Sequence, residues 1–376
     1  MQRDAMRWLG VLMLALCASL PADAATLVNG GTVSGAIGMA GGLDSHVFAA
    51  NAGENVWLRI VDTGNSDFQP KMTVYGPGGT LIGSDYDSDV GKLEFTIASS
   101  GTHTVVVSDA VGTHTGTYTL YHVRVPGANE GGQLINGGAG AGTIDLGDLD
   151  SYTFTANAGE SIWMRIANTG SSVFQPKVTL YDPAGARVAS GYSSQVGDVT
   201  YTPLISGVHT VVVSDTVGTH AGDYKLNLAI APRASEGGTL FDGASKVDAI
   251  DLGDLDSYTF SANGGESIQI RISDTSASVF FPKITLYGPG GGYLTSVRGD
   301  IEATLSRQLT LAGNYTVVVS DSGNGNAQSG SYSIVLTGAG GSEPDTSGDV
   351  PLPLWALALL AGLLGEGLRR GHRLPG

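Results

Sequence analysis

The sequence predicts an all-β protein made of three tandem antiparallel β-sandwich domains, flanked by a cleavable signal peptide and a short C-terminal hydrophobic helix. Three observations predict this class. A long segment returns twice at a spacing of 106 residues. Within each copy, apolar and polar residues alternate with a period of two, which is typical of strands. No segment of the copies has a convincing amphipathic helical pattern.

Composition excludes several other classes. The formal net charge is −16, from 19 Lys+Arg against 35 Asp+Glu, which argues against binding to a nucleic-acid backbone. The single cysteine, Cys17, lies in the predicted signal peptide, so neither a disulfide framework nor a cysteine-based metal site is available. Glycine is abundant, with 57 residues, but it follows no strict Gly-X-Y period, which excludes collagen.

The N-terminal residues 1–24 have the pattern of a secretory signal. Two arginines precede an apolar stretch over residues 8–20, and Ala22 and Ala24 form a small-x-small cleavage signature for signal peptidase. The apolar stretch is shorter than the roughly 20 residues that a transmembrane helix needs. We therefore expect cleavage after Ala24 or Ala25 and an exported mature protein.

The repeats account for most of the remaining chain. Asp44, Asp150 and Asp256 open equivalent Leu-Asp-Ser segments, and later Pro-Lys and Val-Ser-Asp segments keep the same spacing. Units of this size are whole domains, since solenoid and propeller repeats run to about 20–50 residues. The predicted divisions are a signal peptide at 1–24, repeats at 25–127, 128–233 and 234–338, a Gly/Ser-rich spacer at 339–349, and a sorting signal or membrane anchor at 350–376.

The second copy illustrates the expected strands in order. Tyr152 and Phe154 alternate with polar neighbours, and an Asn-Ala-Gly-Glu turn follows. Further strands are expected over 162–166, 178–181, 209–214 and 224–230, and the Asp-Pro-Ala-Gly turn after Tyr181 has a proline that presets φ. Some seven or eight short strands per copy indicate an antiparallel sandwich.

The order of these segments resembles bacterial pre-peptidase C-terminal (PPC) domains. The shared features are Asp-Ser-Tyr-x-Phe, Ala-Gly-Glu, a Leu-Tyr-x-Pro-x-Gly turn, a Thr-Val-Val-Val strand and a closing Gly-x-Tyr. The resemblance covers all three copies. It implies a jelly-roll-like sandwich that accompanies secreted enzymes or surface proteins and that sometimes binds matrix, substrate or calcium. No peptidase domain precedes the copies in this chain.

The C-terminal segment has a second family resemblance. After the spacer come a Val-Pro-Leu-Pro motif, an apolar run over 354–365 and terminal arginines. This arrangement resembles the PEP-CTERM class of exosortase sorting signals, in its VPLP variant, although the Pro-Glu-Pro core is absent and Glu366 interrupts the helix. The processing residues implied are Val350, Pro351, Pro353, Arg369 and Arg370.

That resemblance implies an exosortase-like partner enzyme, a membrane-anchored intermediate, and transfer to the cell surface or extracellular matrix of a Gram-negative bacterium. The alternative is a plain C-terminal membrane anchor. The terminal arginines fit either interpretation, since basic residues stay on the cytoplasmic side.

Closely spaced aspartates open the second and third copies. Calcium takes six to eight oxygen ligands, and acids around a glycine turn supply several of them. The first copy keeps only Asp44 of this pattern. The alternative is that the aspartates cap a turn by hydrogen bonding to local amides. The candidate calcium ligands are Asp145, Asp148, Asp150, Asp251, Asp254 and Asp256.

Two aromatic–arginine pairs, Trp57/Arg59 and Trp163/Arg165, lie on one strand face of their copies, and Gln269 replaces the tryptophan in the third. If the pair is exposed, it is a candidate site at which a sugar or a peptide stacks on the aromatic ring. The alternative is that the pair packs within the protein, with the guanidinium over the ring.

The favoured function is a non-catalytic exported surface or matrix protein, with the sandwiches as spacer or adhesion modules. The alternative is an accessory module that recruits a secreted hydrolase to polysaccharide or protein. No Gly-x-Ser-x-Gly elbow, zinc motif or phosphate loop indicates an enzyme. The acidic surface predicts that divalent cations bridge the protein to an anionic matrix.

Overall fold

The computed structural model describes residues 24–64, 67–170, 173–276 and 280–340. They form strands, turns and two short 3-10 segments, with no α-helix among them, which confirms the predicted all-β class. The described residues accordingly contain no helix with the length and apolar character needed to cross a membrane. The signal peptide up to residue 23, most of the spacer and the C-terminal helix lie outside the described residues. So do the processing residues Ala22, Val350, Pro351, Pro353, Arg369 and Arg370.

Each repeat contains eight equivalent strands in the same order along the chain, and repeat 1 has one additional short strand before them. Repeat 1 has a short first strand, β1 (Ala25–Thr26), and then β2 (Gly31–Ile37), β3 (Asp44–Ala50), β4 (Asn55–Asp62), β5 (Pro70–Tyr75), β6 (Leu81–Tyr86), β7 (Val90–Thr96), β8 (Gly101–Asp109) and β9 (Gly116–Val125). Repeat 2 has β10 (Gly138–Ile144), β11 (Asp150–Ala156), β12 (Ser161–Asn168), β13 (Pro176–Tyr181), β14 (Arg187–Tyr192), β15 (Val196–Tyr201), β16 (Gly207–Asp215) and β17 (Gly222–Ala231). Repeat 3 has β18 (Ser245–Ile250), β19 (Asp256–Ala262), β20 (Ser267–Asp274), β21 (Pro282–Tyr287), β22 (Tyr293–Arg298), β23 (Glu302–Gln308), β24 (Gly313–Asp321) and β25 (Gly330–Thr337).

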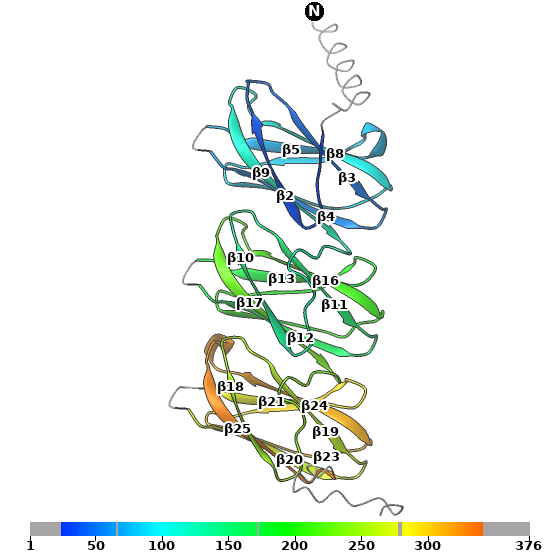
Figure 1. The fold of residues 1–376 in the computed structure, drawn as a ribbon, viewed down its shortest axis with the longest axis vertical. Coiled ribbons are helices and arrows are strands. Elements are labelled where there is room, and N and C mark those ends of the chain that lie inside the picture. The colour runs from blue at the N-terminus through cyan, green and yellow to red at the C-terminus, as the bar shows by residue number, and fades with distance from the viewer. Residues whose placement is uncertain (1–23, 65–66, 171–172, 277–279, 341–376) are drawn as a thin grey trace, which may run out of the picture. The chain divides into compact units, whose positions relative to one another are not determined.

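The strand order in the two sheets of each repeat is that of a jelly roll (Figure 1). In repeat 2 one sheet runs β10-β17-β12-β15 and the other β11-β16-β13-β14. The first, eighth, third and sixth strands therefore form one layer, and the second, seventh, fourth and fifth form the other. Repeats 1 and 3 have the same order, with β1 added in parallel to β3 at one edge in repeat 1. The expectation of a jelly-roll-like sandwich is confirmed.

A separate hydrophobic core fills the space between the two sheets of each repeat. It forms because inward-facing side chains alternate with outward-facing ones along every strand. At its centre an aromatic ring of the second strand stacks on a ring of the seventh strand, 5.1–5.3 Å between centroids. The stacked pairs are Phe48 with His103, Phe154 with His209, and Phe260 with Tyr315.

The recurring Asn-Ala-Gly-Glu segment is a self-capped turn. The Asn51 amide donates to a Glu54 carboxylate oxygen at 2.8 Å, and the Asn51 side chain donates to the other oxygen at 2.9 Å. Gly53 has a φ of 92°, which glycine adopts without steric cost. Arg124 also pairs with Glu54 at 2.6 Å. The glutamate in the motif is therefore structural, because it closes the turn between the second and third strands of the sandwich.

Candidate metal centre

The acidic segment of repeat 3 lies in the turn between β18 and β19. The Asp254 amide donates to the Asp251 carbonyl at 3.1 Å, and an Asp254 carboxylate oxygen accepts the Leu255 amide at 3.0 Å. Asp256 begins β19 and accepts a hydrogen bond from the Tyr332 hydroxyl of β25. The turn role expected from the sequence is thus present, and it leaves the second carboxylate oxygen of Asp254 for other contacts.

Glu236 completes a three-carboxylate cluster with Asp254 and Asp256. One oxygen from each residue lies within 4.8 Å of the others, and this is the only such group within the described part of the chain. The Glu236 amide donates to Ser257 Oγ at 3.0 Å, which holds the segment before the sandwich against β19. Asp251 is not in this group, so the set differs from the one predicted from the sequence.

Burial and nearby negative charge disfavour the ionised forms of Asp256 and Glu236. Burial, with the charges of Asp254 and Asp248 added, raises the pKa of Asp256 to about 8 and that of Glu236 to about 7. Raised values of this kind mean that the cluster binds protons, or a cation in their place, near neutral pH. Hard oxygen donors of this type suit calcium. The ammonium of Lys225 in repeat 2 lies 3.8 Å from Asp254 and supplies part of the needed positive charge.

The equivalent acids of repeat 2 are Glu130, Asp148 and Asp150. Burial, and then the charges of its two partners, raise the pKa of Glu130 to about 7, and burial raises that of Asp148 to about 6. Their oxygens do not meet the distance reached in repeat 3. Asp145, like Asp251, contributes its carbonyl to the turn, at 3.1 Å from the Asp148 amide.

Repeat 1 lacks two of the three acids, with Ala24 and Gly42 at the equivalent positions. Asp44 remains, and it accepts the Tyr118 hydroxyl at 2.6 Å as Asp150 accepts Tyr224 at 2.5 Å. The last aspartate is therefore structural in every repeat. Glu236 was not predicted from the sequence as part of the cluster. One signal for it was available, since the glutamate is missing from repeat 1, the same copy that lacks the equivalent of Asp254.

The aromatic–arginine pairs lie in the junctions between consecutive repeats. Trp57 and Trp163 are 6% and 5% exposed, and Arg59 and Arg165 are buried with them. Each guanidinium carbon lies over its tryptophan, 5.9 Å from the ring centroid in the first pair and 5.1 Å in the second. The expectation of a sugar or peptide site on these four residues is wrong, because the outer face of their strand is covered by the next repeat.

Both junctions use the same pair of faces. We call the outward side chains of β4, β7 and β9, and of their equivalents β12, β15, β17, β20, β23 and β25, the inserting face. The receiving face consists of the outward side chains of the second, fourth and seventh equivalent strands, which are β3, β5 and β8 in repeat 1, β11, β13 and β16 in repeat 2, and β19, β21 and β24 in repeat 3. It also includes the leucine just before the second equivalent strand, which is Leu43, Leu149 or Leu255. The apolar contacts are equivalent at the two junctions: Trp57, Val123 and Val125 meet Leu149, Tyr181 and Val212, and Trp163, Ala229 and Ala231 meet Leu255, Tyr287 and Val318.

Two hollows lie near repeat 3. One, of about 560 Å³, lies at the second junction and is lined by Trp163, Tyr201, Lys283, Tyr287 and Tyr293 together with serine and threonine side chains. The Tyr287 and Tyr293 rings meet edge to face at 6.2 Å.

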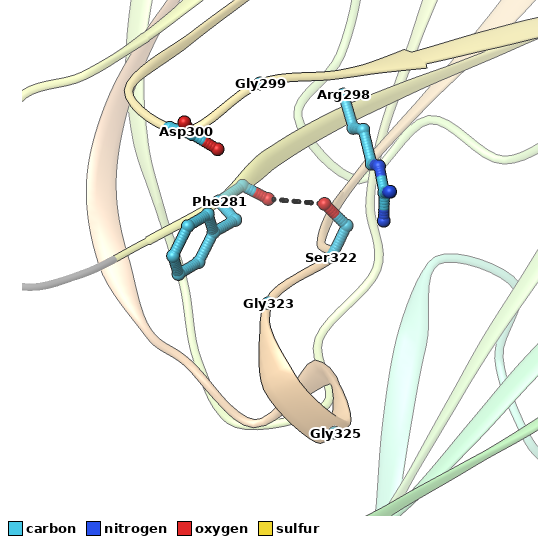
Figure 2. Close-up of a pocket in the computed structure, with 7 residues that line it drawn as sticks. All are labelled: Phe281, Arg298, Gly299, Asp300, Ser322, Gly323 and Gly325. Atoms are coloured by element: carbon cyan, nitrogen blue, oxygen red, sulfur yellow. Dashed lines mark hydrogen bonds between the residues drawn. The ribbon is translucent and has the colours of Figure 1, made fainter.

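The other hollow, of about 600 Å³, is shown in Figure 2. Figure 2 shows Arg298 and Asp300 apart from each other, on either side of Gly299, and the Ser322 hydroxyl donates to the Phe281 carbonyl at 3.2 Å. That hydrogen bond uses the serine in the loop structure, and no histidine lines the hollow.

Neither a family model nor a curated protein matches the sequence. Among solved structures, periplasmic inhibitors of g-type lysozyme named PliG match, from Aeromonas hydrophila with 16% identity and a TM-score of 0.23, and from Salmonella Typhimurium with 21% identity and a TM-score of 0.21. The pre-peptidase C-terminal domain of a collagenase from Bacillus anthracis matches with 20% identity and a TM-score of 0.22. Each match covers 27% of this chain and 93–95% of the other.

Proposed function

We propose that the chain is a non-catalytic exported protein of the cell surface or extracellular matrix, in which three PPC-like sandwiches act as joined spacer or adhesion modules. The buried tryptophan–arginine junctions carry this proposal. Large aromatic and guanidinium groups that are buried between neighbours join successive repeats directly, which is what a spacer requires.

The chemistry of the described residues also supports a non-catalytic role. His103 and His209 are buried, and the Nδ1–H of each donates to a backbone carbonyl oxygen at 3.1 Å. His114 and His220 face Asp109 and Asp215 at 3.4 and 3.5 Å. Within the described residues, no hydrogen bond joins a serine hydroxyl to a histidine ring, so the nucleophile–base pairing of a hydrolase is not assembled there.

The intact mass of the protein from its native host tests export and processing. We expect a species that begins near Ala25 and ends near Val350, recovered from the surface or matrix fraction. Removal of the tail there supports sorting by an exosortase-like enzyme. A species that still carries residues 354–376 and stays in the envelope replaces this proposal with a permanently membrane-anchored protein.

Calcium binding at Glu236, Asp254 and Asp256 is part of the same proposal. We expect titration calorimetry on residues 25–341 to give one weak calcium site that disappears in Glu236→Gln protein, while Asp242→Asn, a substitution elsewhere in repeat 3, leaves it in place. Calcium would also bridge the acidic protein to anionic polysaccharide. Unchanged retention on isolated matrix after chelation contradicts the bridging role.

A second candidate is an accessory module that binds polysaccharide in the hollow at the second junction. Tyrosine rings and hydroxyl groups favour sugars, because the rings stack on apolar sugar faces while the hydroxyls hydrogen-bond. Tyr293 is 60% exposed and is the residue to replace. Saturable polysaccharide binding that is lost in Tyr293→Ala but kept in Tyr192→Ala supports this candidate, and equal binding by both variants contradicts it.

A further inference from the structure

The receiving face keeps several residues unchanged in all three repeats. Tyr75, Tyr181 and Tyr287 occupy one position on it, and the same holds for a leucine, a lysine, a threonine, a valine and a serine. In repeat 1 these residues are Leu43, Lys71, Thr104, Val106 and Ser108. Elsewhere the copies differ, for example at His46 of repeat 1, where repeats 2 and 3 have tyrosine.

In repeats 2 and 3 the centre of the receiving face is covered by the preceding repeat. Tyr181 and Val212 are buried by Trp57, and Tyr287 and Val318 are buried by Trp163. The lysine of this face lies over the inserted tryptophan, with its ammonium 5.9 Å from the Trp57 ring centroid at the first junction and 5.0 Å from Trp163 at the second. The face therefore recognises one chemical pattern in two places, a tryptophan and an arginine two residues apart on a strand.

In repeat 1 no described residue covers this face. Leu43 is 53% exposed, whereas its equivalents Leu149 and Leu255 are each 2% exposed. Tyr75 and Val106 are half-buried and lie outside the core of their own sandwich. The side chains that bury a neighbour in repeats 2 and 3 are thus present, in the same register, on a surface that the described part of the chain leaves open.

The inserting face of repeat 3 shows what happens to a surface that is left without a neighbour. Gln269 replaces the tryptophan, and Thr337, which pairs with Gln269 across the sheet, replaces Ala229. Arg271 remains, but it is 55% exposed and pairs with Glu302 at 3.5 Å. This end has a polar surface of the kind that caps repeat arrays, and it cannot fill the receiving face of a second copy in the way that Trp57 and Trp163 do.

We propose that the receiving face of repeat 1 is a binding site for a separate protein, whose β-sheet presents a tryptophan and an arginine two residues apart. Leu43, Tyr75 and Val106 would enclose the tryptophan, and Lys71 would lie over its ring. Asp109, the equivalent of Asp215 and of Asp321, whose carbonyl accepts Arg165 at 3.1 Å, would face the arginine. The occupant is a partner rather than a second copy, because the one inserting face that is free among the described residues, that of repeat 3, has Gln269 in place of the tryptophan.

The probe for this site is available in the chain itself. Residues 25–235 end after repeat 2 and contain two of the three separate cores, so they expose the native Trp163/Arg165 face. Tyr75→Asp in this fragment blocks its own receiving face and prevents head-to-tail growth. The receptor is residues 25–341, which contain all three cores and have Gln269 at the other end. Binding is measured with the receptor immobilised and the fragment in solution.

We expect saturable one-to-one binding of the fragment to the receptor. Trp163→Ala in the fragment and Tyr75→Asp in the receptor should each weaken it about 30-fold or more, as expected for a central aromatic anchor. Leu311→Asp in the receptor is the control, since Leu311 is an exposed leucine in the turn before β24 of repeat 3, outside the receiving face of repeat 1, and it should leave binding unchanged. Circular dichroism and thermal melting check that every variant is folded.

Three results overturn the proposal. One is no binding at fragment concentrations up to about 500 µM, a range in which even weak interfaces are detected. Another is binding that survives Tyr75→Asp in a folded receptor, which places the contact elsewhere. The third is a dimer of the unmodified receptor that Tyr75→Asp dissociates, which makes a second copy the occupant.

Discussion

The two junctions have the same apolar contacts but different hydrogen bonds. At the first junction the Trp57 indole donates to the Tyr181 hydroxyl across the boundary at 2.7 Å, and Arg59 donates to the Asp148 carbonyl at 3.0 Å. At the second, the Trp163 indole donates at 2.8 Å to Asp198, which belongs to its own repeat.

Asp198 is the centre of the second arrangement. It also accepts Arg165 Nε at 2.8 Å and the Asn326 side chain of repeat 3 at 2.7 Å. Lys92 occupies the equivalent position in repeat 1 and instead donates to the Val217 carbonyl of repeat 2. The apolar contacts, which are the same at both junctions, therefore determine where the repeats join. The hydrogen-bond partners differ because residues such as Lys92 and Asp198 differ at equivalent positions.

The largest expected effect comes from removing a junction tryptophan. Trp57→Ala or Trp163→Ala should each lower the free energy of unfolding by about 3–5 kcal/mol, because a buried indole is replaced by a cavity. Gln269→Ala, at the equivalent exposed position, should change it by less than about 0.5 kcal/mol. Denaturant unfolding of residues 25–341 measures all three, and a large effect at Gln269 would contradict the capped end.

Asp198 should matter more than Lys92. Asp198→Ala leaves the buried Arg165 Nε and the Trp163 indole without an acceptor, which should cost about 2–3 kcal/mol. Lys92→Ala removes one contact of a side chain that reaches solvent and should cost about 1 kcal/mol or less. The same unfolding experiment compares them, and equal losses would show that the two polar arrangements are equivalent.

The acidic cluster beside the second junction predicts a pH effect. The pKa of Asp256 is raised to about 8 in the folded protein, above the value of about 4 expected in the unfolded chain, so folding takes up a proton between these two pH values and stability falls as the pH rises through this window. Without added cations, lowering the pH from 8.5 to 5.5 should therefore raise stability by about 1–2 kcal/mol.

The stabilisation by added calcium should increase with pH, because calcium competes with protons for the carboxylates. We therefore expect calcium to raise stability more at pH 8.5 than at pH 5.5. Thermal melting with and without calcium measures both effects. Glu236→Gln should weaken each of them, and a pH response that this variant leaves unchanged would assign the effect to other groups.

The smallest effect distinguishes the two tyrosines of the receiving face. Tyr181→Phe removes the acceptor of the Trp57 indole and should cost about 1 kcal/mol. Tyr287→Phe should be almost neutral, because within the described part of the chain the Tyr287 hydroxyl makes no hydrogen bond. Paired unfolding curves test this, and equal costs would show that water or a partner satisfies Tyr287.

Sequence periodicity predicted the sandwiches well because alternation with a period of two is a local property of a strand. The spacing of 106 residues likewise revealed the copies without any structure. The candidate ligand residues were harder to interpret. Trp57 and Arg59 lie on the outward face of their strand, and strand alternation does not distinguish an outward face in solvent from one that another domain covers.

The all-β class, the three copies and the alternating core residues could be predicted from the amino-acid sequence, since they follow from local pattern and repetition. The association of Glu236 with Asp254 and Asp256, the burial of the tryptophan–arginine pairs between repeats, and the lack of a covering residue on the receiving face of repeat 1 within the described part of the chain are visible only in the folded protein. These facts depend on which surfaces meet across segments far apart in the chain, and the free energy of such contacts belongs to the pair of surfaces rather than to either segment.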